Sequence, residues 1–170
     1  MNYVNEDNFS RPSAVKTPFT ANGIDEEIMK DKSSFRIYEP YRGFVNGRSS
    51  YFHNSISGYH AAKPKRMQDI YDFYLSKNKF NVLNMLNVKY IVDLNENNSL
   101  GLRLNEENLG NAWFIENIIN VNNSNEEILS LNDLNYSKDC LSRDLPNKKF
   151  TLSEADNIVL TSRKSNELIY

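Results

Sequence analysis

The chain has 170 residues and a formal net charge of −2, with 39% hydrophobic and 25% charged residues. This length predicts one domain with room for a small appendage, and the hydrophobic fraction is large enough for a buried core. No basic excess is present to neutralise phosphates, so the composition argues against a nucleic-acid partner. No apolar run approaches the roughly 20 residues that a bilayer-spanning helix needs. Cys140 is the only cysteine, which excludes an internal disulfide, and we expect it to be a small buried hydrophobe.

The N-terminal third begins without any sustained periodicity. Residues 1–33 therefore predict an irregular arm, with a short helix at about residues 25–30. Residues 34–38 alternate and are closed by Pro40, which is typical of a strand. A long glycine-containing loop is expected over residues 43–58, and loops of that length without secondary structure are often binding elements.

A helix is the clearest prediction in the middle of the chain. Pro64 suits its first turn, and we expect the helix to cover residues 65–75. Apolar side chains recur along it with helical spacing: Met67, Ile70, Tyr71, Tyr74 and Leu75. A second short helix is expected over residues 82–86, and a strand over Lys89–Asp93.

The next segment, residues 94–111, is polar and predicts a flexible connection. Ala112–Val121 has the strongest strand pattern of the chain, and we expect it to pair antiparallel with Lys89–Asp93. Ser124 with Glu127 three residues later fits a capping box, which opens a predicted helix reaching Leu131. A short strand follows over residues 138–142.

This order of elements predicts an α+β fold, with an antiparallel sheet and helices on one face. One arrangement with the same order is the split βαβ pattern of ferredoxin-like folds. Residues 149–152, 158–163 and 167–170 predict strands of a C-terminal β-hairpin or small sheet, which the end of the sequence is expected to cut short. The predicted domains are an irregular arm over 1–33, an α+β core over 34–145 and a C-terminal β segment over 146–170.

The chemically most capable side chains gather between Ser49 and Asp72, where both histidines lie among aromatic and basic residues. One interpretation is a face that binds a sugar or phosphosugar, with aromatic rings against the sugar and cations for phosphate. Its candidate ligand-binding residues are Tyr51, His53, Tyr59, His60, Lys63 and Arg66. The other interpretation is that the aromatic residues anchor the loop in the core, which the large area that aromatic side chains bury favours.

Metal and covalent chemistry find little support in the same residues. Two imidazoles lie in the stretch without a carboxylate or thiol as a third ligand in the loop, whereas zinc sites use three or four ligands. We therefore predict no metal and no cofactor. No set of nucleophile and base is visible, so catalytic residues are left unassigned.

Three motifs carry a resemblance to a known family. They are Ser50–Lys63 followed by Gln68-Asp69, then Val82–Ile91, then Gly110–Phe114. In this order they resemble the extracytoplasmic C-terminal part of YfhO-type bacterial membrane proteins, above all their Bacteroidetes branch, over roughly residues 17–170. The sequence departs from that pattern at Ser57, where glycine is usual, at Pro64, where leucine is usual, and at Met67, where an aromatic is common.

The resemblance implies a domain of a multi-pass, glycosyltransferase-like envelope protein that uses lipid-linked sugars, and a place on the periplasmic side of the inner membrane. The first residues lack a secretory signal, which taken alone predicts the cytoplasm; under the resemblance, membrane helices outside this sequence direct export. The expected partners are the protein's own membrane-embedded region and a glycan or lipid-linked sugar phosphate. Two hypotheses remain: a non-catalytic domain that assists ligand binding, or a purely structural or interaction domain without a ligand.

The two hypotheses differ in how deeply they expect the aromatic side chains near His53 to be buried. Burial of Tyr51, Phe52, His53 and Tyr59 together favours the structural domain, whereas an open groove lined by them favours the binding domain. We expect an ordered, packed loop, because Tyr51, Phe52, Ile56 and Tyr59 are too apolar to remain together in water.

Overall fold

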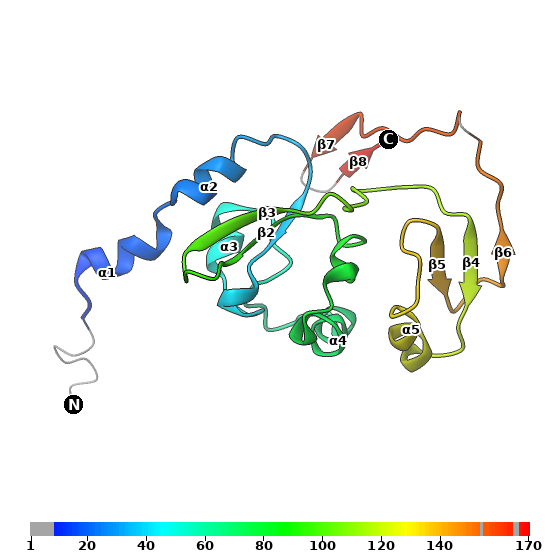
Figure 1. Cartoon of the computed structure of the whole chain (residues 1–170), viewed down its shortest axis with the longest axis horizontal. Helices are drawn as coiled ribbons and strands as arrows, with labels where there is room; N and C mark the ends of the chain where they lie inside the picture. The colour runs from blue at the N-terminus through cyan, green and yellow to red at the C-terminus, as the bar shows by residue number, and fades with distance from the viewer. Residues whose placement is uncertain (1–8, 154, 165–166) are drawn as a thin grey trace. The chain divides into compact units, whose positions relative to one another are not determined.

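The computed structural model describes residues 9–153, 155–164 and 167–170 (Figure 1). The chain forms two compact units: unit 1 joins the described residues up to Ala61 with Lys89–Asn105, and unit 2 joins Ala62–Val88 with Glu106–Tyr170. The units therefore alternate along the chain. The boundaries expected after residues 33 and 145 do not occur in this division.

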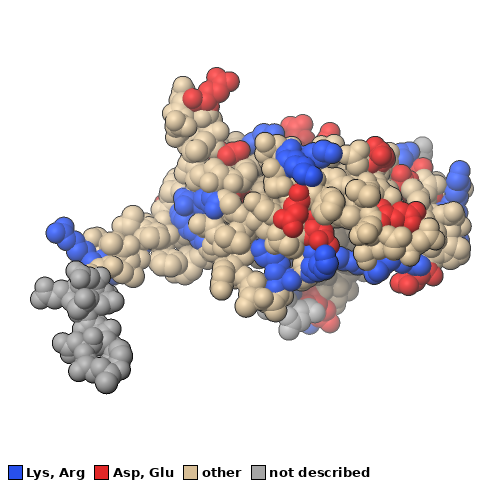
Figure 2. All heavy atoms as spheres, turned by 90° about the horizontal axis from the view of Figure 1, so that it is seen from below, with Lys and Arg blue, Asp and Glu red and all other residues tan. Residues whose placement is uncertain are grey.

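Unit 1 contains short helices and one sheet of order β1-β2-β3. Its elements are α1 (Pro12–Lys16), η2 (Thr17–Phe19), α2 (Gly23–Ile28), β1 (Arg36–Tyr38), η3 (Pro40–Arg42), α3 (Arg48–Phe52), β2 (Val88–Leu94) and β3 (Leu100–Leu104). The expected short helix is present as α2, and the described part of the arm also forms α1 and η2. Residues 9–20 are exposed throughout, as the tan and blue side chains beside the grey N-terminal residues in Figure 2 show.

The hairpin of β2 and β3 corrects the prediction of a flexible polar connection after residue 94. These strands pair antiparallel, with Val92 opposite Leu102 and Leu94 opposite Leu100. Asn98 adopts a left-handed conformation in the turn (φ 57°), which asparagine tolerates better than most residues. The strand was concealed by the run of polar residues that forms this turn.

The core of unit 1 lies where α2 meets the sheet. Ile28, Ile37 and Val92 are buried together, and partly buried neighbours such as Phe35 and Leu102 pack against them. Asn22 caps α2 by accepting hydrogen bonds from the backbone N–H groups of Ile24 and Asp25. The first turn of α2 also contains Asp25, which is 2% exposed.

Unit 2 contains the longest helix and two further sheets. Its elements are α4 (Lys65–Phe73), η4 (Leu75–Lys77), η5 (Phe80–Leu83), β4 (Asn117–Asn120), α5 (Ser124–Ser130), β5 (Asp139–Ser142), β6 (Lys148–Lys149), β7 (Ser162–Lys164) and β8 (Glu167–Ile169). The helix predicted over 65–75 is present as α4, and it ends earlier because Tyr74 leaves helical geometry (φ −125°, ψ −65°). None of the helices formed by the described residues has the length and hydropathy that crossing a membrane requires.

The sheet around β4 has the order β5-β4-β6. Ile118 of β4 lies opposite Cys140 in parallel β5 and opposite Lys148 in antiparallel β6, so β4, α5 and β5 form a βαβ crossover. The predicted antiparallel pairing of residues 112–121 with 89–93 is therefore wrong, and with it the ferredoxin-like arrangement. Strand β2 pairs instead with a partner a few residues away, which closes a much shorter loop.

The α+β class is confirmed, since helices accompany mixed and antiparallel sheets in separate parts of the chain. The C-terminal hairpin is also present, with Arg163 of β7 opposite Leu168 of β8. Lys149, predicted to belong with that hairpin, lies in β6 and pairs with β4 instead.

Candidate functional site

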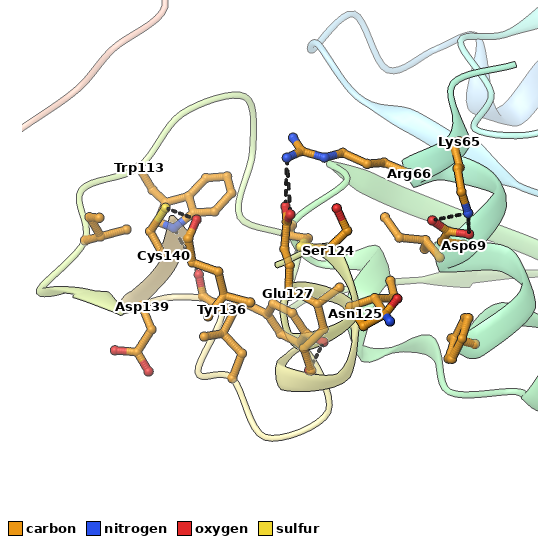
Figure 3. Close-up of a pocket in the computed structure, with 18 of the residues that line it drawn as sticks. Lys65, Arg66, Asp69, Trp113, Ser124, Asn125, Glu127, Tyr136, Asp139 and Cys140 are labelled. Atoms are coloured by element: carbon orange, nitrogen blue, oxygen red, sulfur yellow. Dashed lines mark hydrogen bonds and ion pairs between the residues drawn. The ribbon is translucent and has the colours of Figure 1, made fainter. Parts of the chain in front are cut away.

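Unit 2 encloses a half-open pocket of about 820 Å³ beside α4, α5 and β5 (Figure 3). Most of its wall is apolar. The aliphatic part of the wall includes Ile70, Ile115, Ile128, Leu131 and Leu134. Its size and lining are those of a site for a small molecule of drug-like dimensions.

Two aromatic residues of the wall are fixed by hydrogen bonds to the backbone. Trp113 donates from Nε1 to the carbonyl oxygen of Tyr136 at 3.0 Å, and Tyr136 donates from its hydroxyl to the carbonyl oxygen of Leu131 at 2.6 Å. Burial, with the nearby Tyr74 hydroxyl, raises the pKa of Tyr136 to about 12. Because their polar atoms are already engaged, these residues contribute mainly ring surface to the pocket.

Charged residues of the pocket are paired with one another rather than directed at an empty position. Lys65 Nζ lies 3.1 Å from a carboxylate oxygen of Asp69, and Arg66 lies 3.1 Å from Glu127. Glu127 is also 3.3 Å from Arg143. Both cations that line the pocket, Lys65 and Arg66, are therefore already paired with a carboxylate. Among the residues that the structure describes, the pocket has no unpaired cation for a phosphate.

Cys140 lines the same pocket from β5 and is exposed, which corrects the expectation that it is buried. Strand β5 stands at an edge of its sheet, so fewer neighbours cover it.

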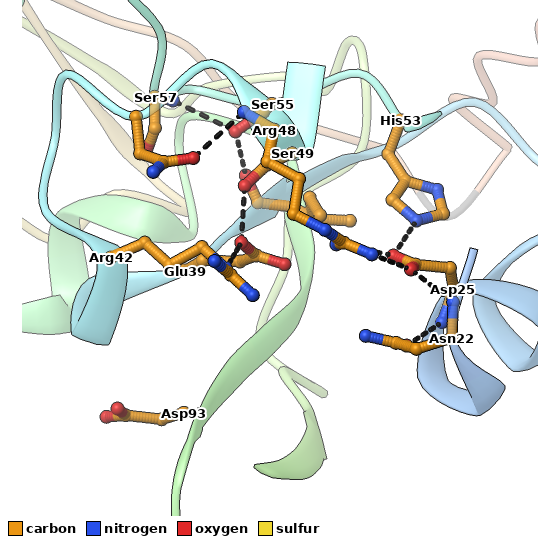
Figure 4. A network of polar contacts seen from close by, with 12 residues as sticks. Asn22, Asp25, Glu39, Arg42, Arg48, Ser49, His53, Ser55, Ser57 and Asp93 are labelled. Carbon is orange, nitrogen blue, oxygen red and sulfur yellow. Dashed lines mark hydrogen bonds and ion pairs between the residues drawn. The ribbon is translucent and has the colours of Figure 1, made fainter. Parts of the chain in front are cut away.

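A network of buried charges lies in unit 1 (Figure 4). Asp25 is 2% exposed, and its carboxylate accepts a hydrogen bond from Arg48 at 2.5 Å and from the backbone N–H of Asn22 at 2.8 Å. The Nε2 atom of His53 lies 3.1 Å from the other oxygen. Burial acts to raise the pKa of Asp25, but the hydrogen bonds from Arg48, from Asn22 and from His53 outweigh it and hold the pKa below its ordinary value.

A second buried carboxylate belongs to the same network. Ser49, fully buried, donates its hydroxyl to Glu39 at 2.6 Å, and Arg42 Nε lies 3.0 Å from the same oxygen. Arg48 and Ser49 are neighbours at the start of α3, so this helix is tied both to Asp25 of α2 and to Glu39 beyond β1. The charged groups of this network are paired with one another, which is typical of a network that stabilises the fold.

The predicted ligand-binding residues occupy different environments. His53 is buried against Asp25, whereas Tyr51 is 63% and Tyr59 is 82% exposed. Tyr51 makes edge-to-face contacts with Phe19 and Phe52 at centroid distances of 5.0 and 4.9 Å. The expected burial of Tyr51 and Tyr59 is therefore wrong. In the short helix α3, the side chain of Ser49 is buried and that of Arg48 is largely buried, whereas Tyr51 is exposed.

The remaining predicted residues fall on either side of the division between the units. His60 is exposed in unit 1, while Lys63 and Arg66 belong to unit 2, with Arg66 at the pocket edge. Over residues 9–153, 155–164 and 167–170, no three His, Cys, Asp or Glu side chains gather as ligands for a metal ion. The prediction of no metal stays a prediction.

Sequence reasoning missed most of the pocket. Trp113 was noted only within the segment Gly110–Phe114, which resembles a family motif. No sequence pattern marks Tyr136 or Leu134 as pocket residues, because the wall of a pocket and a buried core contain the same kinds of side chain. The buried carboxylates were missed as well. Asp25 looked like an ordinary residue in the first turn of a helix, and only its partner 23 residues away makes it distinctive.

No protein-family model matches this chain, and no curated protein or solved structure shows significant similarity to it.

Proposed function

We propose that this chain is a non-catalytic extracytoplasmic domain of a multi-pass, glycosyltransferase-like membrane protein. In this role it assists the binding of an envelope glycan acceptor or a lipid-linked sugar. The proposal takes its context from the three YfhO-type motifs and its binding role from the pocket of unit 2.

The pocket is the observation that carries the binding role. Its apolar wall and its fixed ring faces at Trp113 and Tyr136 suit a ligand with a large apolar surface. The lipid part of a lipid-linked sugar has such a surface, and sugar rings present smaller apolar faces of C–H groups.

The non-catalytic part of the proposal rests on how the titratable groups are engaged. Asp25 and Glu39, the most deeply buried carboxylates in the described chain, are held by Arg48 and Ser49. At the pocket, Glu127 is shared between two arginines. A general acid or base needs access to a proton of the substrate, and these carboxylates are committed to other partners.

A structural domain without a ligand is the second candidate. The observation that favours it is the burial of His53 against Asp25, which makes this part of the family motif an anchor of the fold. In this reading the pocket is a place where unit 2 packs loosely.

A short lipid-linked sugar separates the two candidates. Isothermal titration with glucose attached through phosphate to a farnesyl chain should show saturable binding of one molecule per chain, and the sugar should be recovered uncleaved. A parallel titration follows the fluorescence of Trp113, the only tryptophan of the chain. Absence of binding to this compound and to envelope oligosaccharides would leave the structural domain as the better account.

A further inference from the structure

We infer that the pocket of unit 2 holds a hydrocarbon chain, as found in an isoprenoid or fatty-acyl lipid, and not the sugar or the phosphate of its ligand. This inference rests on the proposed function and makes the ligand class of that site specific.

The first step is the hydrogen-bonding capacity of the wall. Trp113 and Tyr136 already donate their side-chain hydrogen bonds to backbone carbonyl oxygens. Asp139 accepts a hydrogen bond from Asn117 Nδ2 at 2.7 Å, and Ser124 accepts one from Arg143 at 3.1 Å. A sugar placed in the pocket would lose hydrogen bonds to water and find few replacements, which disfavours it.

The second step is charge. The cations that line the pocket, Lys65 and Arg66, are each within 3.1 Å of a carboxylate. A phosphate would have to displace Asp69 or Glu127 from them, and the carboxylates that line the pocket would then repel it. A hydrocarbon chain needs no cation, because its binding free energy depends on the apolar surface area that it buries.

The third step is shape and position. The pocket is half open and about 820 Å³ in volume. Figure 3 shows Lys65 paired with Asp69 at one end, Trp113 at the other, and the Arg66–Glu127 pair between them. An amphiphile can therefore place its chain on the apolar wall and leave its head group in water near the charged pairs. Phe73, which is 41% exposed at the wall, offers further area for the chain.

Alkyl maltosides with eight, ten and twelve carbons, titrated below their micelle-forming concentrations, test this directly through Trp113 fluorescence. We expect a blue shift and a Kd that falls about fourfold per added methylene, or about 15-fold between successive members. Maltose alone should leave the emission unchanged. Dodecanol and farnesol, added in the same way, tell which kind of chain fits better, and binding of either supports the inference.

A pair of matched variants locates the binding. Phe73→Ser removes area from the pocket and should weaken dodecyl maltoside about tenfold. Leu145→Ser, an equally half-exposed apolar residue of unit 2 outside the pocket, should leave the Kd unchanged. Near-ultraviolet circular dichroism checks that both variants keep the native packing around Trp113.

Three results would overturn the inference. They are a Kd independent of chain length, an equal response to maltose alone, and no binding of any amphiphile or alcohol. The response to maltose would leave the proposed function standing, because recognition would then lie in the head group. Binding of the farnesyl-linked glucose that free glucose phosphate fully competes away would also overturn the inference and leave the proposed function standing.

Discussion

The Nε2 atom of His53 lies 3.1 Å from the Oδ1 atom of Asp25, although the two residues are 28 positions apart in the chain. This contact, with the Arg48 ion pair to the same carboxylate, fastens α3 and the following loop to the N-terminal end of α2. The side chain of His53 is thus part of the architecture of unit 1.

Replacing Asp25 by Ala should destabilise unit 1 strongly. Arg48 is only 11% exposed in its side chain and would be left as a buried cation without its carboxylate. Removing one partner of such a pair typically costs about 3–5 kcal/mol of unfolding free energy. Urea denaturation followed by circular dichroism measures the loss. Lys30→Ala, which breaks an exposed pair with Glu27, is the control and should leave the midpoint unchanged within error.

Stability should fall in acid because of the same carboxylate. The pKa of Asp25 is lowered in the folded chain, so the unfolded chain takes up the proton more readily. The contribution is fully present above the ordinary pKa of 3.8 and is lost as the pH falls through the lower folded value. Urea midpoints measured from pH 7 down to pH 2 should decline below about pH 4. A decline of equal steepness in Asp25→Asn would show that other carboxylates carry the effect.

Ser49→Ala should weaken the second buried carboxylate. Ser49 is fully buried and donates its hydroxyl to Glu39 at 2.6 Å. Hydrogen bonds to charged groups contribute about 1.5–3 kcal/mol, and the variant should lose that much unfolding free energy. Ser10→Ala, at an exposed position, provides the comparison. An unchanged midpoint for Ser49→Ala would mean that Arg42 alone satisfies Glu39.

The loop after α3 should be ordered, although its Tyr59 is exposed. The backbone N–H groups of His53, Ile56 and Gly58 donate to carbonyl oxygens at 2.9, 3.1 and 3.0 Å. Hydrogen exchange monitored by nuclear magnetic resonance should therefore show these amides protected, since exchange requires the bonds to open. Fast exchange at all of them would remove the case for a rigid loop.

Tyr136 should resist ionisation and should stabilise the pocket wall up to high pH. Its pKa is raised to about 12, so the folded chain holds the phenolic proton more tightly than the unfolded chain. The contribution is present below the ordinary pKa of 10.0 and is lost as the pH rises through the folded value. The pKa values of Tyr41, Tyr74 and Tyr90 are raised as well. The phenolate absorbance should therefore contain a late-titrating component, from which Tyr136→Phe removes one tyrosine. A normal titration of every tyrosine would place Tyr136 in water.

Local sequence determined the elements that depend on nearest neighbours. The apolar spacing from Met67 to Leu75 required a helix there, and α4 occupies most of it. The α+β class and the C-terminal hairpin followed from similar local patterns. Such features are predictable because side chains within one or two turns of helix, or across one tight turn, decide them.

Tertiary structure decided how those elements pair and which side chains meet. Ile118 pairs with Cys140 and Lys148, not with the strand at residues 89–93. Strand β2 lies between β1 and β3, so both of its edges are occupied. The pocket of Trp113 and Tyr136 and the cluster of Asp25, Arg48 and His53 arise from contacts over long sequence separations. The free energy of such contacts depends on burial and on partners brought by other elements, and neither is written in the local pattern of residues.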